Sequence, residues 1–160
     1  MRPDPMDATP WQTVADSPLL RPGDDAALVE RLLQAARDVR RRAWAPYSGF
    51  QVGAALLDEH GRIHAGCNVE NAAYPQSQCA EATAIGALVV AGGRRIVAAA
   101  VVGVAPQPVS PCGGCRQRLR EFAADTVPIW LADEQRLRVR HTLGELLPAS
   151  FGPDHLAVRS

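Results

Sequence analysis

The sequence predicts one layered α/β domain with a partly parallel sheet. Segments with helical apolar spacing alternate along the chain with β-branched or alternating segments, which is typical of that class. The length of 160 residues suits one domain and is too short for two. With 47% hydrophobic and 21% charged residues, the composition is that of a globular protein. A chain of this size buries roughly 70% of its extended surface, so its core needs no disulfides.

The first element is expected to be a helix that begins after Asp24 or Asp25, since either residue is able to cap it. Its apolar side chains recur every three or four positions and form one stripe: Leu28, Val29, Leu32, Leu33, Ala36 and Val39. The later elements are expected as strands 50–57 and 62–69, helix 81–91, strand 96–105, helix 113–124, strands 127–131 and 137–140, and a helical turn 143–147. The continuous β-branched run 96–105 is typical of a strand covered on both faces.

Three segments are expected. Residues 1–23 contain several prolines and acids without a hydrophobic period, which indicates a flexible or loosely docked leader that Trp11 could pin. Residues 24–152 form the domain, and 153–160 form a C-terminal tail. No internal repeat is present.

Charge and hydropathy exclude several classes of protein. Seventeen basic and 17 acidic residues cancel, so nothing favours binding to a nucleic-acid backbone. The chain contains no lysine, which excludes a Schiff-base or phosphate-loop lysine. The longest apolar run, 96–105, is about half of what a membrane span requires, and no signal-peptide core is present. These observations predict a cytoplasmic protein, whose four cysteines serve metal binding or catalysis more often than disulfides.

The strongest motif is Cys79-Ala80-Glu81 followed by Cys112-Gly113-Gly114-Cys115, because each part opens a predicted helix. Helix N-termini favour thiolates, and thiolates are the form that binds metal. Three thiolates with one vacant position describe a catalytic zinc site, whereas a structural site has four protein ligands. Glu81 lies two residues after the first sulfur, within reach of the vacant position. This is the arrangement of the zinc nucleobase deaminases, in which a glutamate moves protons.

Other interpretations of the cysteines stay open on the residues alone. Cys67 could complete a closed four-cysteine structural zinc site in a non-catalytic module. Cys112 and Cys115 could instead form a dithiol redox pair, although this leaves Cys79 and Glu81 without a role. All four cysteines could also be inert core residues.

Five stretches in order, 46–56, 66–75, 79–81, 110–117 and 146–151, resemble the small homotetrameric zinc-dependent cytidine deaminases. The resemblance covers about residues 26–151. It implies a three-layer α/β/α fold with a five-stranded mixed sheet. It also implies one Zn²⁺ per chain on Cys79, Cys112 and Cys115, with Glu81 as the proton shuttle.

The resemblance assigns a substrate side as well. Asn68 and Glu70 match the ribose-binding pair, and Phe50 matches the aromatic residue that packs on the pyrimidine. Positions i and i+2 of an extended chain face the same way, so the first two side chains could share one sugar.

Four further positions complete the expected pocket. By resemblance, the Ala80 backbone N–H and the carbonyl around Ser110 hold the edge of the ring. Phe151 is implied to arrive from a neighbouring subunit, and Tyr74 could do the same. The implied assembly is therefore a homotetramer with shared active sites.

One departure concerns the charge at the metal. The family commonly carries an arginine directly after Cys-Ala-Glu, and here that position is Ala82. Arg116, next to Cys115, is the remaining candidate cation. Deaminases of the nucleoside antibiotic blasticidin S also lack that arginine and are the alternative. The resemblance implies hydrolytic deamination of cytidine and 2′-deoxycytidine to uridine and 2′-deoxyuridine with release of ammonia, in pyrimidine salvage.

Overall fold

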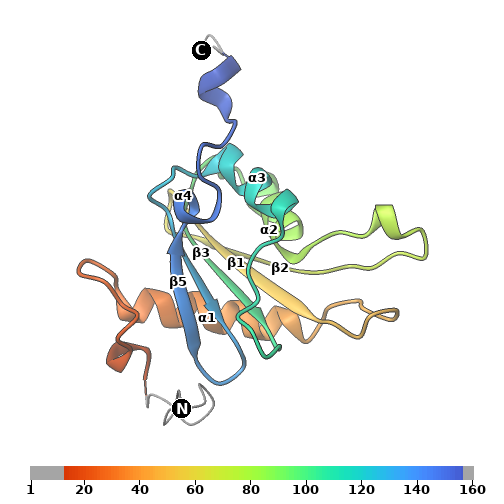
Figure 1. The fold of residues 1–160 in the computed structure, drawn as a ribbon, viewed down its shortest axis with the longest axis horizontal. Helices are drawn as coiled ribbons and strands as arrows, with labels where there is room; N and C mark the ends of the chain where they lie inside the picture. The colour runs from red at the N-terminus through yellow and green to blue at the C-terminus, as the bar shows by residue number, and fades with distance from the viewer. Residues whose placement is uncertain (1–12, 157–160) are drawn as a thin grey trace, which may run out of the picture.

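The computed structural model describes residues 13–156, which form a five-stranded sheet with helices on both faces (Figure 1). In chain order the elements are η1 (Val14–Asp16), α1 (Ala26–Arg40), β1 (Val52–Asp58), β2 (Ile63–Cys67), η2 (Tyr74–Gln76), α2 (Ala80–Val90), β3 (Ile96–Gly103), α3 (Gly113–Phe122), β4 (Pro128–Ala132), β5 (Leu137–Thr142), α4 (Leu143–Leu146) and η3 (Pro153–Leu156). From β1 to α4, every expected strand and helix is present within two residues of its predicted bounds.

The sheet has the strand order β2-β1-β3-β4-β5 and is mixed. β1 pairs antiparallel with both β2 and β3, β3 pairs parallel with β4, and β4 pairs antiparallel with β5. The one parallel pair requires a crossover, and α3 provides it. The predicted α/β class with a five-stranded mixed sheet is confirmed.

Two hydrophobic cores lie on the two faces of the sheet, which makes the domain three-layered. On one face the stripe of α1 packs on residues of β1, β3 and β4, with Leu32, Leu33 and Ala36 fully buried. On the other face α2, α3 and α4 contribute residues such as Ala84, Leu119 and Leu143 to the second core. Because both faces are covered, β3 is buried along nearly its whole length, as its β-branched run predicts.

α2 approaches β2 unusually closely, and this closeness places the start of α2 beside the end of β2. A Cβ atom on Gly66 would lie 2.3 Å from the Ala84 backbone nitrogen and 2.7 Å from the Ala80 carbonyl oxygen. Only glycine therefore fits at this position in β2.

Local signals explain where the first elements begin. The Asp25 carboxylate accepts hydrogen bonds from Ala27 N at 3.0 Å and Leu28 N at 3.2 Å, so it is the helix cap expected at Asp24 or Asp25. β1 starts at Val52 rather than at Phe50, because the side chain of Asn68 bonds to Val52 N and to the Phe50 carbonyl, each at 2.8 Å. A side chain thus replaces the sheet ladder there.

Part of the expected leader is packed against the domain. Val14 in η1 is buried among α1 and neighbouring strands, and its side chain belongs to the first core. Trp11 lies outside the described residues, and the boundaries at 23 and 152 stay a prediction. None of the described helices is sufficiently long and apolar to cross a lipid bilayer.

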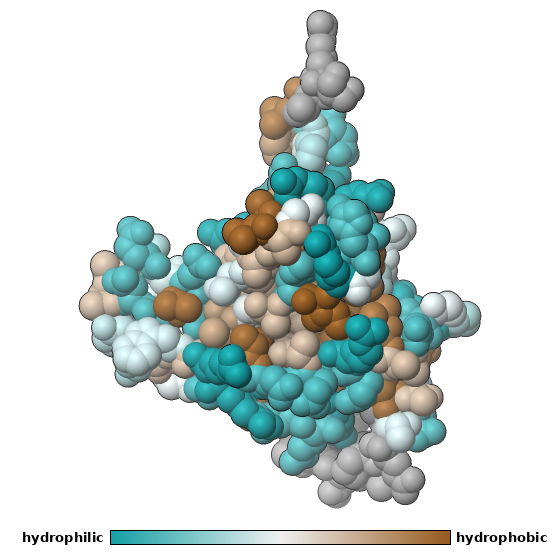
Figure 2. Space-filling model, turned by 180° about the vertical axis from the view of Figure 1, so that it is seen from behind, coloured by the Kyte–Doolittle hydropathy of each residue, from teal (hydrophilic) through white to brown (hydrophobic). Residues whose placement is uncertain are grey.

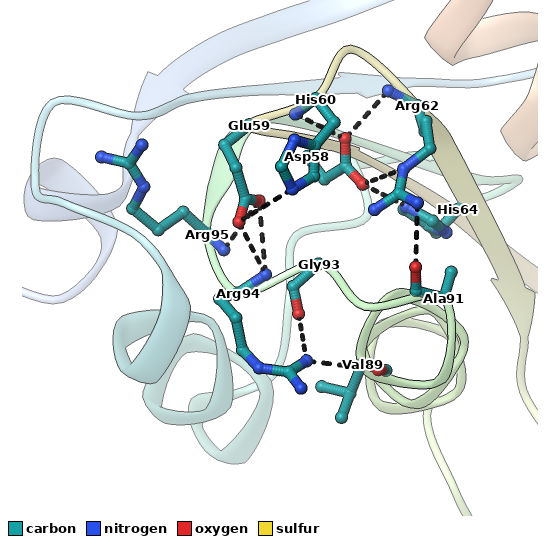
Figure 3. A network of polar contacts seen from close by, with 10 residues as sticks. All are labelled: Asp58, Glu59, His60, Arg62, His64, Val89, Ala91, Gly93, Arg94 and Arg95. Carbon is teal, nitrogen blue, oxygen red and sulfur yellow. Dashed lines mark hydrogen bonds and ion pairs between the residues drawn. The ribbon is translucent and has the colours of Figure 1, made fainter.

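A dense polar network joins the far ends of β1, β2 and α2 (Figure 3). The buried Asp58 carboxylate accepts hydrogen bonds from Arg62 Nε and His64 Nε2, both at 2.8 Å, and from His60 N and Arg62 N, both at 2.9 Å. Arg62 also donates to the Ala91 carbonyl at the end of α2. The network therefore fixes how α2 lies on the β1–β2 hairpin.

Candidate active site

Three cysteine sulfurs meet where two helices begin. Cys79 is the N-cap of α2, Cys112 is the N-cap of α3, and Cys115 lies in the first turn of α3. Their Sγ atoms all lie within 4.8 Å of one another, and those of Cys79 and Cys112 are 3.8 Å apart. The three residues predicted as zinc ligands are therefore brought together by the fold.

The position at two helix starts has an electrostatic consequence. Neither Cys79 nor Cys112 caps its helix through a side-chain hydrogen bond. The N–H groups of the first turns carry positive partial charge and face the cluster, which favours anionic sulfur. Ala80 is the first residue of α2, so its N–H belongs to this set of helix-end donors.

Glu81 points into the same corner. It is 4% exposed, and one carboxylate oxygen accepts a hydrogen bond from the Cys115 thiol at 3.3 Å. Burial raises the pKa of Glu81, because an apolar surrounding disfavours the charged form. A buried carboxyl beside the sulfurs is suited to accept and return a proton.

The protonation states of the clustered thiols depend on one another. A hydrogen bond from the Cys115 thiol is the largest cause that lowers the pKa of Cys79 to about 6. The pKa of Cys115 is raised in turn, first by its hydrogen bond to Cys79 and then by burial. Crowded thiolates of this kind repel one another unless a cation lies among them, so the donor set fits a bound divalent metal such as zinc.

The alternatives for the cysteines find little support in the geometry. All four cysteines are free thiols, so Cys112 and Cys115 form no disulfide. Within residues 13–156, the only metal-capable cluster contains three cysteines and excludes Cys67, which lies at the end of β2. The site is therefore not a closed four-cysteine centre, and one coordination position remains for a ligand.

An open cavity of about 440 Å³ leads to Cys79. Its walls come from three segments: the turn after α1, the strand end after β2, and the segment before α2. The lining residues are Tyr47, Ser48, Asn68, Glu70, Tyr74, Ser77, Gln78 and Cys79. Three of the predicted substrate residues, Asn68, Glu70 and Tyr74, therefore line one cavity with a sulfur at its edge.

The predicted sugar pair is held firmly. Glu70 accepts hydrogen bonds from the amides of Tyr47 at 2.8 Å and Ser48 at 3.2 Å, and from the Ser48 hydroxyl. The Ser48 hydroxyl is the main cause that holds the pKa of Glu70 below its usual range, so this group is a carboxylate at neutral pH. An anionic carboxylate with spare lone pairs accepts hydrogen bonds from sugar hydroxyls.

Two of the predicted aromatic residues lie close to the cavity. Tyr74 is 71% exposed and lines the cavity of its own chain, where its ring contacts Tyr47 edge-on with centroids 5.8 Å apart. Its position there requires no neighbouring subunit. Phe50 lies beside the cavity rather than among its lining residues, with its amide bonded to the Ser48 hydroxyl at 3.0 Å.

Phe151 lies in the C-terminal segment and does not line the cavity of its own chain. Phe151 is 56% exposed, and its contribution to the pocket of another subunit stays a prediction.

Arg116 contacts the protein loop rather than the sulfurs. Its guanidinium donates to the Pro111 carbonyl and the Leu146 carbonyl at 2.8 Å, and to the Ser110 hydroxyl at 3.0 Å. Arg116 therefore holds the Ser110–Pro111 segment, which leads into Cys112. Two of the predicted site residues, Ser110 and Arg116, are in direct contact.

Several residues of this site were not predicted from the sequence. The positive charge of Arg118 lowers the pKa of both Cys79 and Glu81. Its signal was its position three residues after Cys115, on the same face of the predicted helix. Ser48 and Gln78 were also missed, and their positions depend on how separate loops meet, which spacing does not encode.

Comparisons with known proteins point in one direction. The profile of a family described as "Cytidine and deoxycytidylate deaminase zinc-binding region" matches residues 27–131. A cytidine deaminase of Sporosarcina psychrophila is 43% identical over 129 residues, which cover 81% of this chain and 95% of the relative. A cytidine deaminase of Mycobacterium tuberculosis is 44% identical over 114 residues, 71% of this chain and 82% of the relative.

Solved structures agree with this similarity. The crystal structure of cytidine deaminase from Burkholderia pseudomallei has a TM-score of 0.72 and 43% identity, and covers 76% of this chain and 98% of that one. The crystal structure of cytidine deaminase from Mycobacterium tuberculosis has a TM-score of 0.67 and 40% identity, and covers 78% of this chain and 97% of that one.

Proposed function

The chain belongs to the cytidine and deoxycytidylate deaminase zinc-binding family, and from this premise we propose that it hydrolyses cytidine and 2′-deoxycytidine to the corresponding uridines and ammonia. The observation that carries the proposal is the buried Glu81 carboxyl beside three clustered sulfurs, next to an open cavity lined by Asn68 and Glu70. This corner joins a proton carrier, a metal-capable donor set and a binding cavity.

Several expectations from the sequence are confirmed at this level. The family, the α/β fold, the enzyme class and one zinc ion per chain agree with the comparisons and with the sulfur cluster. A non-catalytic zinc module, a dithiol redox protein and a blasticidin S deaminase are not favoured.

The roles of the residues follow from their positions. Cys79, Cys112 and Cys115 hold the zinc, which when bound supplies the Lewis acidity that makes water nucleophilic at neutral pH. Glu81 accepts the proton of the attacking water and delivers it to N3 of the cytosine ring. The same carboxyl then takes the proton of the new hydroxyl group at C4 and passes it to the amino group, so that the C4 carbonyl forms as the C–N bond breaks and ammonia leaves.

The cavity orients the nucleoside for this proton transfer. Asn68 and Glu70 bind the sugar hydroxyls, and the Phe50 and Tyr74 rings contact the base and sugar. The Ala80 N–H and the carbonyl at Ser110 hold the polar edge of the ring. Arg116 supports this edge indirectly, since it fixes the Ser110–Pro111 segment.

The proposal extends to the oligomeric state of the enzyme and to its location in the cell. We infer a homotetramer in which Phe151 of one chain completes the pocket of another, because Phe151 is exposed and is not among the residues that line the cavity of its own chain. A cytoplasmic enzyme of pyrimidine salvage accords with the nucleoside-sized cavity and with the balanced charge, which offers nothing for a polynucleotide.

The direct test is a spectrophotometric assay of the purified protein. Cytidine, 2′-deoxycytidine and blasticidin S are incubated in parallel while the cytosine absorbance is followed and zinc is measured by elemental analysis. We expect loss of the cytosine spectrum with both nucleosides and about one zinc per chain. Turnover of blasticidin S alone, or of none of the three by zinc-loaded protein, would refute the proposal.

A further inference from the structure

We propose that α3 acts as a brace that sets the position of Phe151, with Arg120 and Gln117 as positioning residues for deamination in a second copy of the chain. The inference rests on the proposed function, in which pockets are shared between subunits. It assigns a role to two residues that contact neither the sulfurs nor the cavity.

The C-terminal arm, defined as residues 147–156, projects from the body of the domain. In Figure 1 the chain leaves α4 and runs upward past the sheet to η3, and Figure 2 shows this projection with hydrophobic surface on it. Phe151 is 56% exposed and Leu156 is 64% exposed. An exposed apolar tip on a projecting arm is typical of a segment that docks onto another subunit.

The projecting arm is held at several points. Arg120 donates to the Ser150 hydroxyl at 3.0 Å and to the Asp154 carboxylate at 2.9 Å, on either side of Phe151. Gln117 donates to the Phe151 carbonyl itself at 2.9 Å. Arg116 adds a bond to the Leu146 carbonyl just before the arm. Positions 117 and 120 lie on one face of α3, so one helix surface holds the arm throughout.

The contact between α3 and the arm is tight at Gly152. A Cβ atom there would lie 2.6 Å from the Arg120 Cζ atom, so any larger residue must displace the guanidinium. The Arg120 side chain is itself only 13% exposed. The arm and the guanidinium are therefore packed together rather than merely adjacent.

The arm also orients the ring of Phe151. His155 stacks on that ring with centroids 5.0 Å apart and planes at 24°, and its Nδ1 atom accepts from Gly152 N at 3.1 Å. His155 covers one face of the Phe151 ring, and the residue still remains 56% exposed. A ring that is held in place and exposed is suited to stack on a base or to close a pocket.

These contacts link two sites on one helix. The first turn of α3 carries Cys112 and Cys115 for the pocket of its own chain, while its later turns hold the arm that serves another pocket. A shift of the arm by about 1 Å is sufficient to weaken a positioned contact strongly. The brace therefore controls substrate affinity in the second copy.

The experiment compares Arg120→Gln and Gly152→Ala with Phe151→Ala, using the zinc-loaded full chain. Gly152→Ala keeps every side chain of the brace and only displaces Arg120, so it stands in for Arg120→Gln if that variant fails to fold. Glu121→Gln is the matched control, because this exposed side chain of α3 has no polar partner among the described residues.

We expect Phe151→Ala to raise KM for cytidine between about fivefold and 100-fold, the range for loss of an aromatic contact with a base. Both brace variants should raise KM about three- to tenfold with kcat within about twofold and zinc unchanged, since the ring is misplaced rather than removed. Glu121→Gln should leave both constants unchanged.

A mixing experiment separates this role from a structural one. Each brace variant is assembled with excess Glu81→Gln chains, whose pockets are inactive but whose arms are intact. We expect KM of the active pockets to return toward the wild-type value. Persistence of the raised KM in the mixture, or an unchanged KM in both brace variants while Phe151→Ala raises it, would overturn the inference.

Failure of the underlying proposal has a different signature. If the wild-type chain does not deaminate cytidine, or if it is monomeric and Phe151→Ala has no effect, the proposed shared pocket is wrong. The brace inference is then overturned together with it.

Discussion

The two ends of the unit formed by β1, β2 and α2 differ in how their polar groups are satisfied. At the far end, the Asp58 carboxylate accepts four hydrogen bonds and Glu59 accepts from the amides of Arg94 and Arg95 (Figure 3). At the near end, Cys79 begins α2 without a side-chain cap bond and lies beside an open cavity. The difference shows that one end holds the three elements together, while the other end keeps polar groups available for metal and substrate.

The same elements pass through both ends, which makes the comparison informative. Arg62 ties the β1–β2 hairpin to the end of α2 through the Ala91 carbonyl at 2.8 Å. Because a helix is stiff, fixing its C-terminal end also fixes the place where its N-terminus presents Cys79 and Glu81. The end of the unit whose polar groups are all hydrogen-bonded, here called the saturated end, therefore supports the open end that carries Cys79 and Glu81.

The largest expected effect comes from removing a sulfur at the open end. Cys112→Ala should lose zinc and reduce cytidine turnover by more than about 10⁴-fold, because the remaining donors no longer hold the ion that activates water. Elemental analysis and the spectrophotometric assay measure the two effects. Cys67→Ala is the matched control, since Cys67 lies outside the sulfur cluster, and it should keep its zinc. Full zinc content in Cys112→Ala would contradict the ligand assignment.

Glu81→Gln tests the proton carrier without removing the metal. Loss of a general acid–base group lowers rates by typically 10²–10⁴-fold, so kcat should fall by at least about 100-fold with about one zinc per chain retained. Steady-state kinetics and metal analysis on the same preparation measure this. A variant that turns over cytidine at close to the wild-type rate would remove Glu81 from the mechanism.

At the saturated end we expect a substitution to lower stability and to leave activity nearly unchanged. Asp58→Asn replaces an acceptor of four hydrogen bonds with a group that cannot match them, so Tm should fall on the order of 10 °C. In protein that is still folded, kcat/KM should change by no more than about threefold, since the bond from Arg62 to the Ala91 carbonyl and the core contacts of α2 remain and keep Cys79 and Glu81 in place. Calorimetry and kinetics measure the two quantities.

His60→Gln is the control for that experiment, because it removes only the contact of the exposed His60 side chain with Glu59 at 3.7 Å and should leave Tm nearly unchanged. If Asp58→Asn abolished activity while Tm stayed high, the division of labour between the two ends would be wrong.

The pH dependence of Tm in Asp58→Asn tests whether the ionised carboxylate is the stabilising form. Burial alone would raise the pKa of Asp58, but hydrogen bonds from His64, Arg62 and the His60 amide outweigh it and hold this pKa well below its usual range. A depressed folded-state pKa contributes stability above the unfolded-state value of about 3.9 that is lost as pH falls toward the folded-state value. The Tm difference between wild type and Asp58→Asn should therefore be constant from about pH 8 to 5 and narrow below about pH 4. A difference that widens in acid would show that the carboxylate is not the stabilising form.

The smallest expected effect is that of Arg118→Met. Its exposed positive charge acts on Cys79 and Glu81 at a distance, so kcat/KM should fall only about two- to fivefold, and less at high salt. Arg95→Met, which removes an exposed charge at the saturated end, is the control. Kinetics at low and high ionic strength distinguish a charge effect, which is screened, from a packing effect, which is not.

The metal corner was predictable because its members lie close to helix starts in the sequence. Cys79 and Glu81 are two residues apart and Cys112 and Cys115 are three apart, so local spacing already places each pair on one end of a helix. The strands were predictable for a similar reason: the β-branched run of β3 is a local property that also reports burial on both faces.

The geometry of the cavity walls could not be predicted from local spacing. Glu70 is held by the amides of Tyr47 and Ser48, more than twenty residues earlier, so its geometry depends on two loops that meet only in the fold. Arg116 was expected near the sulfurs because it follows Cys115, yet its long side chain turns toward the Pro111 and Leu146 carbonyls. Adjacency in the chain does not determine where a flexible side chain finds acceptors.

By itself, the order of residues determined the class of the fold, the three sulfurs and the acid beside them, because these follow from periodicity and short spacing. Only the tertiary structure decided which end of α2 is fixed by the Asp58 network, how Arg120 and Gln117 hold the arm, and that Phe151 does not line the cavity of its own chain. Those features depend on hydrogen bonds between segments thirty or more residues apart or on the burial of a carboxylate. Such contacts form only once the sheet and its two helical layers bring the segments together.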